Sequence, residues 1–186
     1  MPLNIPNLVT LSRIIVIPLL VGVFYMPFTP ETQNITATAL FIFAGITDWL
    51  DGYLARRLNQ MSPFGAFLDP VADKLIVVSA LLALLYLNRV DVIVSLIIVG
   101  REIAISALRE WMAKVGQTAA VAVAFIGKAK TVAQMVAIPL LLFHDPLLGL
   151  DCQFLGTILV NVAAVLTVIS MLYYLRKALP YASVRS

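Results

Sequence analysis

The chain has 186 residues, of which 61% are hydrophobic and 12% are charged, with a mean hydropathy of +0.98 and a formal net charge of +3. About half of the residues in an ordinary soluble domain are apolar, so this composition excludes that class and predicts an integral membrane protein. The lone Cys152 excludes an internal disulfide and a thiolate metal site. The small positive charge fits a neighbourhood of anionic lipid and gives no indication of nucleic-acid binding.

Six apolar segments, separated by polar residues or by Pro and Gly, follow one another along the chain. A transmembrane helix needs about 20 apolar residues, which leaves room for roughly six spans and no separate soluble domain. We therefore expect an all-α fold of six transmembrane helices, forming one catalytic domain over residues 1–186. The expected spans are 8–27, 35–58, 66–87, 91–113, 121–143 and 153–176. We expect the first span to remain in the mature protein and not to be cleaved as a signal peptide, because no Lys or Arg precedes it and no small-residue cleavage site follows it.

Lys and Arg residues near the ends of the spans predict the orientation, since they concentrate on the cytoplasmic side. With the N-terminus inside, Arg89 is the only Lys or Arg residue expected on the opposite side. We therefore expect a multi-pass protein with both termini in the cytoplasm. The basic residues expected at the cytoplasmic ends are Arg56, Arg57, Arg109, Lys114, Arg176, Lys177 and Arg185.

Further polar residues lie within the predicted spans, in their cytoplasmic halves or near mid-membrane. Arg13 lies early in the first span, and the others come from the second to the fifth. Together they predict a polar cavity that opens to the cytoplasm. They are Asp48, Asp51, Asp69, Asp73, Lys74, Arg101, Glu102, Arg109, Lys128 and Lys130.

Four of these residues are aspartates at helical spacing. Asp48 and Asp51 share one helix face, as do Asp69 and Asp73 on the next helix, and the short connection between the helices should let the two faces meet. Each charge near the bilayer centre costs about 2.5 kcal/mol or more, so cations should balance them. Oxygen ligands favour Mg²⁺ or Mn²⁺, and two such ions suit in-line displacement at phosphorus. A single membrane aspartate has alternatives: a packed polar contact, or an ion path in a transporter.

The pattern Asp48-x2-Asp51-Gly52-x2-Ala55-Arg56-x8-Gly65-x3-Asp69-x3-Asp73 resembles the signature of the CDP-alcohol phosphatidyltransferase family at every position. The resemblance implies a CDP-linked donor, release of CMP, and commonly a homodimer. It implies two Mg²⁺ (or Mn²⁺) ions held by Asp48, Asp51, Asp69 and Asp73, with Asp73 also the general base. The nucleotide-binding residues that it implies are Asp48, Gly52, Arg56, Ser62 and Gly65, and the likeness of the opening segment, given below, adds Asn7 and Thr10.

Basic residues outside this pattern indicate which acceptor, the alcohol that attacks the donor, the protein would use. Arg101, Arg109, Lys128 and Lys130 fall in or near predicted spans, where a cation is costly unless an anion meets it. A phosphate group on the acceptor would supply that anion, and Arg binds it well through paired hydrogen bonds. The alternative for Arg101 is an internal salt bridge to Glu102 or to an aspartate.

The segments "NIPNLVTLSRIIVIP", "GREIAISALRE" and "GKAKT" look like those of the bacterial phosphatidylglycerophosphate synthases within the family. That likeness implies CDP-diacylglycerol as donor, sn-glycerol 3-phosphate as acceptor, and the bacterial cytoplasmic (inner) membrane as location. Two other acceptors remain open: phosphatidylglycerol, as in a cardiolipin synthase, and inositol phosphate. A cation transporter is the alternative from another class, although such a protein should show repeat symmetry and polar groups on both sides of the membrane.

Overall fold

The computed structural model describes residues 5–58, 63–116 and 125–181; within these ranges the side chains of 5–8, 51–58, 63–64, 66, 125–126 and 128 are left out of the description. The described ranges contain helices and no strands, which confirms the predicted all-α fold. The six α-helices are α1 (Ile5–Gly22), α2 (Pro30–Leu58), α3 (Pro63–Tyr86), α4 (Val92–Lys114), α5 (Phe125–Phe143) and α6 (Cys152–Ala178). Two short 3-10 helices, η1 (Val23–Tyr25) and η3 (Leu179–Tyr181), extend α1 and α6.

Each predicted segment coincides with one helix, and the largest difference in where a helix begins is at α2. This helix starts at Pro30, whereas the apolar pattern predicts a start at residue 35. Proline suits the first helical position, Glu31 suits the first turn, and the Thr32 backbone N–H donates to the Thr29 hydroxyl at 3.3 Å. The polar residues before position 35, which the apolar pattern treats as a loop, therefore form the first turn of α2.

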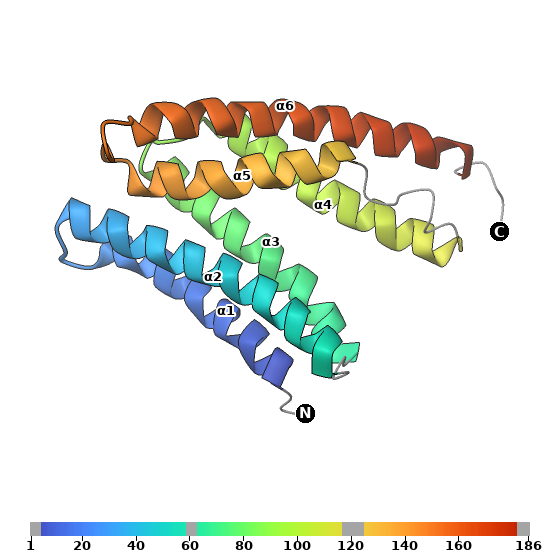
Figure 1. Cartoon of the computed structure of the whole chain (residues 1–186). Coiled ribbons are helices and arrows are strands. Elements are labelled where there is room, and N and C mark those ends of the chain that lie inside the picture. Colours follow the sequence, from blue (N-terminus) through green and yellow to red (C-terminus); the bar gives the residue numbers. More distant parts are fainter. Residues whose placement is uncertain (1–4, 59–62, 117–124, 182–186) are drawn as a thin grey trace.

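Consecutive helices run antiparallel, in two groups of three (Figure 1). Helix α1 packs against α2 and α3, α6 packs against α4 and α5, and α2 contacts α5 across the groups. The groups diverge toward the end where α2 and α4 finish and α3 and α5 begin (Figure 1). That end holds the motif aspartates and the basic residues of α4 and α5.

At the other end, Arg89 in the α3–α4 turn ties the two groups together. Its guanidinium donates to the Leu142 carbonyl at 2.8 Å, to the Leu141 carbonyl at 3.3 Å and to Asn34 Oδ1 at 2.8 Å. The carbonyls at the end of α5 have no following helical turn whose backbone N–H groups could donate to them, and Arg89 supplies those hydrogen bonds instead. Burial lowers the pKa of Arg89 from its ordinary value, and Asp145 opposes that shift. This local bonding gives a physical reason for one basic residue on the predicted non-cytoplasmic side.

Helices α5 and α6 pack closely at Gly156. A Cβ at this position would lie 2.8 Å from Leu141 Cγ and 3.2 Å from the Leu141 backbone nitrogen. Gly156→Ala is therefore expected to destabilise the protein by about 1–3 kcal/mol, because the helices would have to move apart. Thermal unfolding in detergent measures this. Gly100→Ala is the matched control, since a Cβ at Gly100 meets nothing within 4 Å; equal melting temperatures for the two variants would contradict the close packing.

Large apolar side chains lie exposed on the outside of every helix, which is typical of a surface that faces lipid. By length and composition, one helix of the described ranges, Cys152–Tyr181, is long and apolar enough to cross a membrane, and Val9–Tyr25 and Ala129–Phe143 are shorter apolar helices. Charged residues interrupt the apolar sequence of α2, α3 and α4. The six-span topology thus stays a prediction. Examples of the exposed side chains are Ile15, Ile35, Leu82, Ile103, Val132 and Leu172.

Candidate functional site

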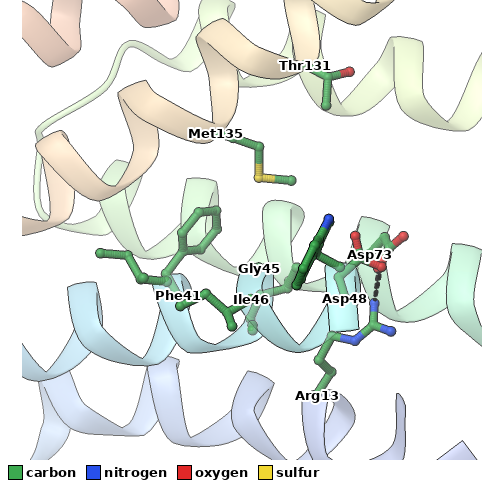
Figure 2. A pocket seen from close by; sticks show the side chains of 12 residues that line it. Arg13, Phe41, Gly45, Ile46, Asp48, Asp73, Thr131 and Met135 are labelled. Carbon is green, nitrogen blue, oxygen red and sulfur yellow. Dashed lines mark hydrogen bonds and ion pairs between the residues drawn. The ribbon is translucent and has the colours of Figure 1, made fainter. Parts of the chain in front are cut away.

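Three of the four predicted metal ligands meet at Arg13 of α1. Arg13 Nη1 lies 2.9 Å from Asp48 Oδ1 and also bonds to Asp73, while Nη2 lies 3.9 Å from Asp69 Oδ1. The arginine side chain is 0% exposed, whereas those of Asp48, Asp69 and Asp73 are 47%, 42% and 41% exposed. One buried cation thus lies against three carboxylates that remain partly exposed. Figure 2 shows Arg13 with two of them, Asp48 and Asp73.

Thr10, one turn before Arg13 on α1, adds a hydrogen bond to the cluster. Its hydroxyl donates to Asp69 Oδ1 at 2.6 Å, and the residue is buried. The structure thus places Thr10, a predicted nucleotide-binding residue, against a predicted metal ligand. Gly65 is buried at the start of α3.

The structure does not describe the side chains of several predicted site residues. Ser62 lies outside the described residues altogether. The others lie within helices, so their place along the fold is known. These are Asn7 in α1, Asp51, Gly52 and Arg56 in α2, and Lys128 in α5.

Two cavities adjoin the aspartates. The first, of about 490 Å³, lies between α2 and α5, and its lining is mostly apolar. The second, of about 270 Å³, is bordered by Lys74, Glu102 and Lys130. The cavities share Asp48 and Asp73 on one side and Thr131 and Met135 of α5 on the other, and Figure 2 shows the two aspartates facing α5 with Arg13 behind them. The apolar lining comprises Phe41, Ile42, Ala44, Gly45, Ile46, Trp49, Ile76 and Met135.

An ion pair with a buried lysine borders the second cavity. Lys130, 2% exposed, bonds to Glu102, which also lies 3.4 Å from Arg101. Lys74 donates to the Ser106 hydroxyl nearby. Of the two described cations that border this cavity, Lys130 is therefore partly neutralised by Glu102, whereas Lys74 bonds to a neutral hydroxyl.

The other two predicted acceptor-binding residues with described side chains flank Tyr174 of α6. The guanidinium carbons of Arg101 and Arg109 lie 5.9 Å and 5.7 Å from the centre of its ring. Arg101 also donates to the Ser170 hydroxyl at 3.3 Å. The internal salt bridge considered for Arg101 is present, and binding of an acceptor phosphate stays a prediction for both arginines.

Comparison with known proteins decides the family. A family model described as CDP-alcohol phosphatidyltransferase matches residues 3–169. The chain belongs to this family. Among similar curated proteins, the CDP-diacylglycerol–glycerol-3-phosphate 3-phosphatidyltransferase of Salmonella choleraesuis (strain SC-B67) is 49% identical over 180 residues, covering 96% of each chain. The proteins of the same name from Shigella flexneri serotype 5b (strain 8401) and Escherichia coli (strain K12) are 48% identical over the same shares.

Membership of the CDP-alcohol phosphatidyltransferase family implies a divalent metal ion, and the chemistry of the site fits one. Asp48, Asp69 and Asp73 offer partly exposed carboxylate oxygens, which are ligands for hard cations. Within the described side chains, no three acidic, His or Cys groups are arranged around a common point where an ion would bind. The carboxylates converge on Arg13, whose guanidinium supplies positive charge between them.

Sequence reasoning placed Arg13 among the polar residues of the cavity and assigned it no role. A signal was present, because Thr10 and Arg13 are spaced i, i+3 and so share one face of an apolar helix. Two polar side chains on one face indicate a polar partner. The apolar cavity had no comparable signal, because its lining residues resemble any other membrane-helix side chains.

Proposed function

We propose that the chain transfers the phosphatidyl group of CDP-diacylglycerol to sn-glycerol 3-phosphate, giving phosphatidylglycerophosphate and CMP. Family membership and the names of relatives at 48–49% identity support this proposal. The structural observation that carries it is the pair of cavities, one mostly apolar and one charged, that share Asp48 and Asp73. A lipid donor and a charged acceptor need such neighbouring sites.

The apolar cavity suits the donor lipid. Trp49, Ile46 and Phe41 lie along α2, moving away from the aspartates, so acyl chains bound there would leave the pyrophosphate beside Asp48 and Asp73. We assign Asn7, Thr10, Asp48, Gly52, Arg56, Ser62 and Gly65 to the nucleotide part of the donor, as the resemblance of the motif segment and of the opening segment implies.

The charged cavity suits the acceptor. Lys130 borders it and is almost fully buried, so a phosphate dianion would be held strongly there. We assign Arg101, Arg109, Lys128 and Lys130 to that phosphate. Lys130 is part of the lining of the cavity, and the two arginines lie outside that lining. Neutral acceptors such as serine would not need these cations.

The reaction is a single displacement. The Asp73 carboxylate takes the proton from the primary hydroxyl of glycerol 3-phosphate, and this oxygen bonds to the phosphorus that carries diacylglycerol. The bond from that phosphorus to the bridging oxygen breaks, and CMP leaves with that oxygen. Two Mg²⁺ (or Mn²⁺) ions, held by Asp48, Asp51, Asp69 and Asp73, would neutralise the pyrophosphate when bound.

We further propose a single domain of six spans in the bacterial inner membrane, with both termini in the cytoplasm and two copies forming a homodimer. The exposed apolar side chains on all six helices support the lipid environment. The cavities beside Asp48 and Asp73 lie toward the basic end of the molecule, which supports a cavity open on the cytoplasmic side, where Lys and Arg concentrate.

The test is CMP release by the purified protein with CDP-diacylglycerol and Mg²⁺, across four acceptors: glycerol 3-phosphate, inositol phosphate, serine and phosphatidylglycerol. Release with glycerol 3-phosphate alone, abolished by EDTA, is the expected result. Release with another acceptor would keep the donor chemistry and overturn the assignment of the charged cavity. No release with any acceptor from folded protein would favour the transporter.

A further inference from the structure

We propose that Arg13 is an internal counter-cation that holds Asp48, Asp69 and Asp73 together while no metal ion is bound. Arg13 is thus a positioning residue of the metal site. This inference rests on the proposed function in taking the aspartates as metal ligands.

The geometry carries the proposal. Arg13 comes from α1, whereas Asp48 lies on α2 and Asp69 and Asp73 lie on α3, so one side chain joins three helices. A guanidinium presents five N–H donors in a fixed plane and stays charged at any physiological pH. It can therefore bond several carboxylates at once, which an ammonium on a flexible stem does less well.

Burial makes the arginine and the aspartates depend on one another. Arg13 is 0% exposed, and a buried cation without an anion beside it is strongly destabilising. Conversely, Asp48 and Asp73 bond to the same guanidinium nitrogen, so their negative charges would repel one another without it. The hydrogen bond from Thr10 to Asp69 extends the same contact from the next turn of α1.

A divalent ion would supply positive charge to the same carboxylates. The contribution of Arg13 to stability should therefore be large without the metal and smaller with it. An arginine that serves only to pack the helices together would contribute equally in both conditions, and this difference separates the two roles.

The experiment compares the melting temperature of Arg13→Gln with that of the unaltered protein in detergent, once in EDTA and once in excess Mg²⁺. We expect Arg13→Gln to melt about 5 °C lower in EDTA and to recover more than half of that deficit in Mg²⁺. Arg89→Gln is the matched control, because Arg89 is also bonded across the helix groups but lies at the opposite end from the aspartates. Its deficit should be the same in both conditions.

Two further variants keep the test decisive if Arg13→Gln does not fold. Arg13→Lys should show a smaller deficit with the same dependence on Mg²⁺, and adding Asp48→Asn to Arg13→Gln should raise the melting temperature in EDTA by removing one repelling charge. A deficit that is equal with and without Mg²⁺, or no deficit, would overturn the proposal. If the unaltered protein neither releases CMP nor responds to Mg²⁺, the proposed function itself fails, which is a separate result.

Discussion

Asp73→Asn is expected to lower the rate of CMP release by about a thousandfold, because a positioned general base contributes roughly 10²–10⁴ in rate. The amide keeps the shape of the side chain and cannot accept the proton of the attacking hydroxyl. Asp73 borders both cavities, so its carboxylate can reach a hydroxyl in one and a phosphorus atom at the boundary with the other. The measurement is the steady-state rate with saturating CDP-diacylglycerol, glycerol 3-phosphate and Mg²⁺.

Asp91→Asn is the matched control for this variant. Asp91 caps α4 by accepting from the Ile93 backbone N–H at 2.7 Å, at the end of the molecule opposite Asp73. Asparagine caps helices about as well as aspartate, so this variant should keep its activity. If Asp73→Asn retained more than a tenth of the activity, the assignment of Asp73 as the base would be wrong.

Lys130→Met is expected to raise the KM for glycerol 3-phosphate about a hundredfold, since losing one partner of a buried charge pair costs about 2–5 kcal/mol. Methionine has similar length and no charge, so the phosphate would lose its buried cation while the cavity keeps its shape. The KM for CDP-diacylglycerol should stay within about threefold, because Lys130 borders the charged cavity and is absent from the lining of the apolar one.

Lys114→Met provides the comparison. Lys114 also forms an ion pair, with Glu110 at 2.9 Å, but its side chain is 73% exposed. Exposed pairs of this kind contribute little, so both KM values should be unchanged. A larger rise in the KM for CDP-diacylglycerol than for glycerol 3-phosphate in Lys130→Met would instead assign Lys130 to the donor.

The helices were predictable because each apolar segment is long and is bounded by Pro, Gly or polar residues, and such signals are local. The predicted start of α2 was misplaced because Pro30 and Glu31, which suit the first turn of a helix, do not belong to an apolar segment and were therefore counted as a loop. Local signals also identified the aspartates of the motif, through their helical spacing and their match to the family.

The partners of Arg13 could not be predicted in the same way. Its contact with Asp48 joins positions 35 residues apart, and the contact with Asp73 joins positions 60 apart. Such contacts depend on the rotation of α1 against α2 and α3, which one sequence does not reveal. Likewise, the two cavities are lined by residues of α2, α3 and α5, so no single segment encodes their shape.

The wall shared by the two cavities has a consequence for how the substrates influence each other. Asp48 and Asp73 line both cavities. A ligand in one cavity that changes the orientation of either side chain therefore changes the surface that a ligand in the other cavity contacts. Such linkage is reciprocal, so whatever the bound nucleotide lipid adds to the affinity for the acceptor, the acceptor adds equally to the affinity for the lipid. Cooperation between donor and acceptor would then require no movement of whole helices, only two carboxylates that both ligands touch.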